Sequence, residues 1–91
     1  MSLSNGIKGS TKDFIKIYPI PAGENLYLEI DHFSGKVTIS IYDIVGTVVK
    51  TEEIEYLNQY KIDMNDLDTG IYFISFVIDN ELITKRILIE N

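Results

Sequence analysis

The 91-residue sequence contains no cysteine, no tryptophan and a single histidine. Without cysteine there is no disulfide framework, no thiolate metal site and no cysteine nucleophile. No apolar run is as long as a membrane-spanning helix, which needs about 18 residues. No secretory signal is visible near the start. Eight Lys and Arg stand against fourteen Asp and Glu, a formal net charge of −6. This scarcity of basic residues argues against nucleic acid and against an anionic membrane surface as partners.

The remaining composition is that of a globular protein, with 45% hydrophobic and 24% charged residues. A chain of this length has room for one hydrophobic core. Residues 1–13 are small and polar, which predicts a flexible lead-in or linker, and Met1-Ser2-Leu3 is typical of an expression-vector start. We therefore expect a linker over residues 1–13 and a single domain over residues 14–91.

Short strand-like runs begin at Phe14, and none of them keeps a helical period. The runs cover residues 14–18, 26–30, 37–41, 47–51, 59–63, 71–78 and 82–89. Their spacing of roughly ten residues is typical of a small β-sandwich. No connection is long enough for a helical crossover, so neighbouring strands are expected to be antiparallel. The pattern predicts an all-β, seven-stranded antiparallel β-sandwich.

The last two runs predict a β-hairpin. Asp79 and Asn80 separate them, and both residue types tolerate positive φ, which suits a two-residue type I′ turn. Such a turn places Ile78 opposite Glu81, and this first pair fixes every other cross-strand pair of the hairpin. One face of the hairpin is then expected to lie in the core: Tyr72, Ile74, Phe76, Ile78, Ile83, Ile87 and Ile89.

The other face of this hairpin mixes apolar side chains such as Ile71 and Phe73 with Ser75 and Arg86. One interpretation is that a loop or the N-terminal segment covers it, and the other is a docking surface for a protein or a preceding domain. The final strand also has the character of an edge, which can recruit a partner strand. Lys85 and Arg86, side by side, are instead typical of edge protection.

The sequence offers no catalytic constellation. His32 lies in a turn, no Gly-x-Ser-x-Gly motif is present, and we interpret this residue as a solvated turn histidine. Glu52, Glu53 and Glu55 are interpreted as a solvated face, not as paired acids across a cleft. The glycines are scattered and make no phosphate-binding loop. We predict no catalytic, cofactor or metal site.

The segment 63–70 resembles a calcium-binding loop only superficially. Counting from Asp66, position five is Gly70 and position twelve is not Glu, so the EF-hand pattern fails. We expect a turn instead, in which Asx side chains cap the backbone and Leu67 fills the core. Gly70 is expected to supply backbone freedom before the next strand.

Three short motifs, together with the closing Thr84–Ile87, resemble the type A C-terminal sorting domain of the type IX (Por) secretion system of Bacteroidota. The motifs are Tyr18–Ala22, Ile41–Gly46 and Leu67–Phe73, and the similarity in order and spacing covers residues 14–89. The resemblance implies a seven-stranded Ig-like sandwich at the C-terminus of a larger exported protein. It also implies a non-enzymatic domain that an outer-membrane translocon recognises, with the cargo secreted or held at the cell surface.

The resemblance assigns roles to the matched positions. Most are expected to build the fold: Tyr18, Pro19 and Pro21 at the first corner, Tyr42, Asp43 and Gly46 at a turn, Leu67 in the core, and Gly70 and Tyr72 at the start of the final hairpin. Lys85 and Arg86 are the residues expected to meet the translocon. The implied partners are components of the translocon and the preceding cargo domain, with no nucleic acid, no membrane span and no cofactor.

A second hypothesis stays open, in which the domain is an Ig-like adhesion or carbohydrate-binding module of a surface protein. The sequence contains six tyrosines, and aromatic rings stack on sugars. Tyr27 and Tyr56 are the candidate sugar contacts, and the half-apolar face of Ile71 and Phe73 is the candidate adhesive surface.

Overall fold

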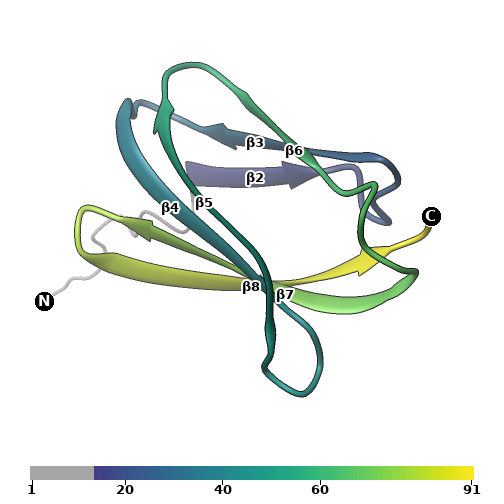
Figure 1. Ribbon diagram of the computed structural model, residues 1–91. Coiled ribbons are helices and arrows are strands. Elements are labelled where there is room, and N and C mark those ends of the chain that lie inside the picture. Colours follow the sequence, from purple (N-terminus) through teal and green to yellow (C-terminus); the bar gives the residue numbers. More distant parts are fainter. Residues whose placement is uncertain (1–13) are drawn as a thin grey trace, which may run out of the picture.

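The computed structural model describes residues 14–91, which form two packed antiparallel sheets (Figure 1). The strands are β2 (Ile15–Tyr18), β3 (Asn25–Ile30), β4 (Gly35–Tyr42), β5 (Val48–Tyr56), β6 (Tyr60–Asp63), β7 (Gly70–Ile78) and β8 (Glu81–Ile89). The predicted seven-stranded sandwich is confirmed, although β5 extends five residues beyond the expected end at Thr51, to Tyr56. The linker predicted over residues 1–13 lies outside the described residues.

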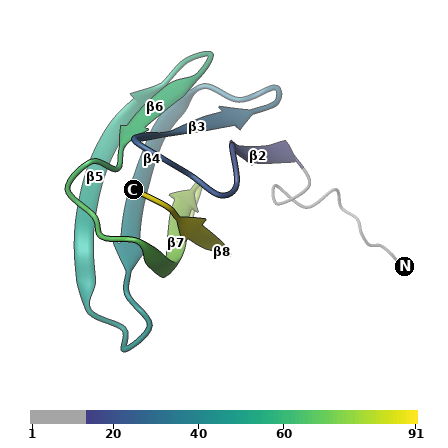
Figure 2. The same cartoon turned by 90° about the vertical axis from the view of Figure 1, so that its right-hand side faces the viewer.

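The strand order follows the immunoglobulin pattern. The smaller sheet has the order β2-β3-β6 and the larger sheet the order β5-β4-β7-β8. In immunoglobulin terms these are strands A, B and E facing strands C′, C, F and G. The view in Figure 2 shows β2 and β8 on one side of the molecule and β5 and β6 on the other.

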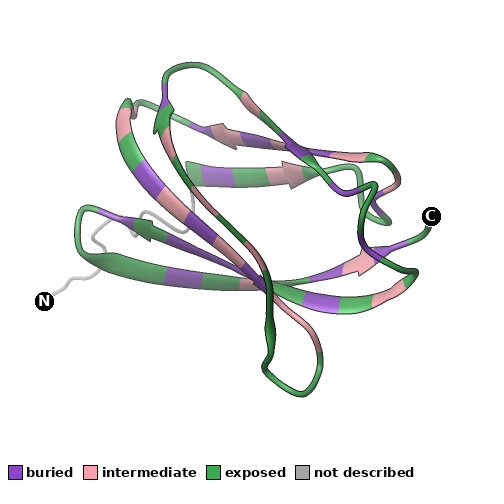
Figure 3. Cartoon of the chain, viewed as in Figure 1, coloured by how far each residue is buried: buried purple, intermediate pink, exposed green. Residues whose placement is uncertain are grey.

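The core lies between the two inner faces, where alternate residues of β3, β4 and β7 are buried, whereas those of the edge strand β5 are mostly half-buried (Figure 3). Phe76 on β7 is the largest fully buried side chain. Its fully buried neighbours are mostly β-branched residues and leucines, which pack well on a pleated surface: Leu26, Leu28, Val37, Ile39, Ile41, Ile62, Ile74, Ile78, Ile87 and Ile89. Each full burial of such a side chain contributes about 1.5–3 kcal/mol.

The β7–β8 hairpin has the predicted turn and register. Asp79 has φ 50° and Asn80 has φ 67°, the left-handed pair that a type I′ turn requires. Ile78 pairs with Glu81 and Ser75 with Thr84, as expected. The side chains predicted to face the core are all buried. This register is confirmed because a two-residue turn leaves no freedom to slip.

The outer face of the larger sheet remains open. Leu82 is 67% exposed, and three neighbours are 37–44% exposed: Ile71, Phe73 and Val77. No loop within residues 14–91 covers them, so that part of the covering hypothesis is wrong, while the N-terminal segment lies outside the described residues. Hydroxyl side chains cross the middle of this face in one row, with hydrogen bonds of 3.3 Å between Ser40 and Thr51 and 3.2 Å between Ser75 and Thr84.

Candidate functional site

The first motif forms the corner between β2 and β3. Pro19 and Pro21 are exposed, both of their preceding peptide bonds are cis, and Ala22 is fully buried. Ala22 donates its N–H to the Leu88 carbonyl at 2.8 Å and accepts from the Glu90 N–H at 2.7 Å. The corner therefore leaves the smaller sheet and makes a parallel bridge to the edge of β8. Within residues 14–91, these two are the backbone hydrogen bonds that join the corner to β8.

The second motif forms the turn between β4 and β5. Asp43 Oδ1 accepts the N–H of Val45 at 3.0 Å and of Thr47 at 2.9 Å. Gly46 has φ 93°, where a side chain is strained. Tyr42 ends β4 at an irregularity of the β4–β5 register and is half-buried. These contacts hold the backbone of the turn and use up the acceptor capacity of one carboxylate oxygen.

The third motif lies between β6 and β7. Leu67 is buried and Tyr72 donates its hydroxyl to the Asp68 carbonyl at 2.8 Å. This is the tyrosine corner of Ig-like sandwiches. Gly70 has no left-handed φ, and a Cβ there would meet its nearest atom, on the Tyr72 ring, at 3.7 Å. The expectation that Gly70 is needed for backbone freedom is therefore wrong.

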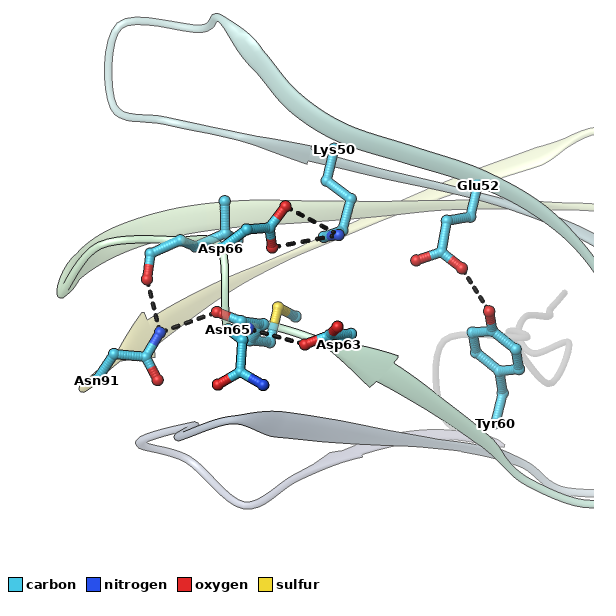
Figure 4. Close-up of polar contacts among 9 residues, drawn as sticks. Lys50, Glu52, Tyr60, Asp63, Asn65, Asp66 and Asn91 are labelled. Atoms are coloured by element: carbon cyan, nitrogen blue, oxygen red, sulfur yellow. Dashed lines mark hydrogen bonds and ion pairs between the residues drawn. The ribbon is translucent and has the colours of Figure 1, made fainter.

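The connection between β6 and β7 is also tied to the last residue of the chain (Figure 4). Asn91 Nδ2 donates to the Met64 carbonyl at 2.8 Å and to the Leu67 carbonyl at 2.6 Å. Asp63 Oδ1 accepts the Asn65 N–H at 2.9 Å and caps the turn. No group of three or more metal-ligating side chains is found within residues 14–91.

Lys85 and Arg86 are adjacent in sequence but point to opposite faces of β8. Lys85 pairs in register with buried Ile74 and is partly buried on the inner face, whereas Arg86 pairs with Phe73 and is exposed on the outer face. Neither residue makes an ion pair within the described part of the chain. Together they leave uncompensated positive charge on both sides of one edge strand.

The remaining candidate residues are dispersed. His32 lies in an exposed turn with φ 57°. Together with Asp31 and Asp79 it lines a cavity of about 230 Å³. Glu52 accepts a hydrogen bond from Tyr60, and Glu53 pairs loosely with Lys36 at 4.0 Å. No described helix is long and apolar enough to cross a membrane.

Tyr56 and Tyr27 occupy very different environments. Tyr56 is 2% exposed, and its hydroxyl accepts the Ile30 N–H at 2.7 Å and donates to the Asn58 carbonyl. The hypothesis that Tyr56 contacts a sugar is therefore wrong. Tyr27 instead stacks on Tyr18 on the outer face of the smaller sheet, with ring centroids 5.7 Å apart.

A polar cluster surrounds this stacked pair, and no sequence motif indicates it. Tyr18 donates its hydroxyl to Glu29, which raises the pKa of Tyr18 and lowers the pKa of Glu29. Gln59 Nε2 donates to the Tyr18 hydroxyl at 2.7 Å. The alternation of β2 and β3 put Tyr18 and Tyr27 on outer faces, but their pairing depends on the register between the strands.

Fold and surface together define a class of protein, an Ig-like β-sandwich whose sequence motifs build its corners and turns. The family model for the secretion system C-terminal sorting domain, Por_Secre_tail, matches residues 16–90. The chain therefore belongs to this family of type IX secretion sorting domains, as its motifs predicted. The family is not known as one of enzymes. A search of curated proteins found no match.

Proposed function

We propose that this domain directs a larger cargo polypeptide through the type IX outer-membrane translocon, to the cell surface or into the medium. The observation that carries the proposal is the family match over residues 16–90, nearly the whole described sandwich. The folded domain acts as a sorting signal and catalyses no reaction. Its cargo precedes it in the same polypeptide, and the linker over residues 1–13 joins the cargo to the domain at Phe14.

The two ends of the sandwich support a division of labour. β2 begins at the end where the β7–β8 turn lies, whereas the corner after β2, the β6–β7 connection and Asn91 lie at the opposite end (Figure 1). A cargo attached at Phe14 therefore leaves the opposite end of the sandwich accessible, where the first corner meets the last residues of β8. We assign translocon recognition to Arg86, which is exposed, and to Lys85 beside it.

The test is export of a reporter fused to this domain. A periplasm-competent reporter followed by residues 1–91 is produced in a type IX-proficient host and in the same host without the translocon. We expect the reporter outside the cell only in the proficient host. A reporter that stays periplasmic there, with the fused domain folded by limited proteolysis, overturns the proposal.

The Tyr18–Tyr27 stack favours carbohydrate binding as a second candidate function, because Tyr18 is 36% exposed and aromatic faces stack on sugars. A glycan array tests it with the intact chain and with Tyr27→Ala. Binding that disappears in the variant supports a carbohydrate-binding module. Tyr42→Phe, which removes the hydroxyl of a half-buried tyrosine away from the stack, serves as the control. Absence of binding by the intact chain rejects this candidate.

A further inference from the structure

The outer edge of β8 presents a row of backbone groups that face away from β7. The Leu88 carbonyl and the Glu90 N–H point to this side, since both bond to Ala22. Backbone groups alternate between the two sides of a strand, so those of Leu82, Thr84 and Arg86 point the same way. No other backbone group within residues 14–91 bonds to these three.

An apolar groove lies at the end of this open row. It has a volume of about 280 Å³, and its walls come from the first corner and from the outer face of the larger sheet. The lining residues are Ile20, Pro21, Ile71, Arg86, Ile87 and Leu88. Arg86 is the one charged residue among them, so the groove combines room for an apolar side chain with a guanidinium at the same place.

Charge determines which strand fits this edge. An added strand would meet Arg86 on the outer face and Lys85 on the inner face, and neither has an ion-pair partner in the described part of the chain. A strand with acidic side chains neutralises both, whereas a basic strand is repelled. An inward-pointing lysine also discourages indiscriminate edge pairing.

The chain already pairs with the end of this edge. Ala22 makes two backbone hydrogen bonds to β8, and no other residue of the corner adds one. An incoming segment would continue the same line along Arg86, Thr84 and Leu82.

We propose that the β8 edge captures an extended acidic segment of the translocon by strand addition. The backbone row supplies the ladder hydrogen bonds, the groove receives one apolar side chain, and Arg86 and Lys85 receive carboxylates. This inference rests on the proposed function and deepens it, because it names the chemistry of the partner segment and the way in which it binds.

The test uses the intact chain and two synthetic peptides, one alternating valine with glutamate and one alternating valine with lysine. We expect the acidic peptide to bind and to slow amide hydrogen exchange at Leu82, Thr84 and Arg86. Arg86→Glu should weaken binding at least about tenfold, whereas Lys36→Glu, on the same face but on β4, should leave it unchanged. Equal binding of the lysine peptide, or no protection of the three amides, overturns the proposal.

Two further arms separate strand addition from simple charge attraction. N-methylation of alternate peptide bonds in the acidic peptide should abolish binding without any change to the protein. Thr84→Pro should do the same, since its N–H points to the open side and is not needed by the β7–β8 ladder. If Thr84→Pro strongly lowers the melting temperature, its loss of binding could come from unfolding, and the N-methylated peptide alone then tests strand addition. Binding that survives N-methylation overturns strand addition.

The outcomes also distinguish this inference from the proposed function. A reporter that is exported although the acidic peptide fails to protect the edge leaves the function standing and removes the inference. Edge protection with a reporter that stays periplasmic shows that the edge captures an acidic strand, but it removes the proposed function and with it the translocon as the partner. A dimer in analytical ultracentrifugation that protects the same three amides would show that a second copy occupies the edge, which overturns the acidic partner.

Discussion

The two edges of the larger sheet are tied to the smaller sheet in different ways. At β5, side chains reach across: Tyr60 donates its hydroxyl to Glu52, and Lys50 Nζ lies 3.3 Å from Asp66 Oδ1 (Figure 4). At β8, the backbone of Ala22 makes the connection. The β5 edge carries Glu52, Glu53 and Glu55 and is bound by side chains, whereas the β8 edge has Lys85 and Arg86 near its middle and is mostly open. The comparison shows that the two sheets can be connected at both edges while most backbone groups on the outer side of β8 stay free to bind another strand.

The largest expected effect is that of removing β8. Deleting residues 82–91 removes the buried side chains of Ile83, Ile87 and Ile89 and uncovers the inner strand β7. The loss exceeds about 5 kcal/mol, which is comparable to the whole stability of a small domain. We expect unfolding or aggregation together with loss of sorting. Circular dichroism and light scattering check this, and a folded monomer would show that β8 is peripheral.

Breaking the backbone connection should have the next largest effect. Ala22→Pro removes the N–H that donates to the Leu88 carbonyl, and we expect a loss of about 2 kcal/mol in the free energy of unfolding. Urea denaturation measures it. Gly23→Ala is the matched control, because its new Cβ would have nothing closer than the Glu90 carbonyl oxygen at 3.9 Å. Equal stability of the two variants would mean that the bridge contributes nothing.

Breaking the side-chain connection at β5 should cost less. Tyr60→Phe removes the hydrogen bond to Glu52, and we expect a loss of about 1 kcal/mol at neutral pH. Lys61→Ala, at the neighbouring exposed position of β6, is the control. A loss larger than that of Ala22→Pro would reverse the comparison between the two edges.

The same hydrogen bond predicts a pH dependence. The bond to the Glu52 carboxylate raises the pKa of Tyr60 from 10 to about 12, and burial adds to the shift. The folded state then holds this proton more tightly than the unfolded chain, so the contribution is complete below pH 10 and is lost as the pH rises through 12. The stability difference between the wild-type chain and Tyr60→Phe should shrink over that interval. A difference that stays constant to pH 12 would contradict the shift.

The smallest effect on stability is expected at the open edge. Arg86→Ala removes an exposed side chain that has no ion-pair partner in the described part of the chain, so stability should stay within about 0.5 kcal/mol. Export of the fused reporter should nevertheless fall strongly. Normal export by a stable Arg86→Ala protein would remove Arg86 from recognition.

The candidate surface was only partly visible in the sequence. The motifs identified the family, and Lys85 and Arg86 were selected as recognition residues, an assignment that stays a prediction. The polar connections could not be foreseen, because Glu52 and Tyr60 lie on different sheets and Tyr56 reaches Ile30 across 26 residues. Gly70 was misjudged, since a glycine before a strand does not by itself reveal its φ.

What the sequence by itself determined is local. Period-two alternation predicted the strands, and Asp79-Asn80 predicted the turn and the register of β7 with β8, because each depends on residues near one another in the chain. The sequence also indicated that the final strand is an edge, which the strand order confirms. Only the tertiary structure decided that β5 is the other edge of the larger sheet, that Ala22 bridges to β8, and that the groove beside Arg86 is apolar. These features depend on how the two sheets are joined, and contacts between distant segments follow from the packing of the whole core.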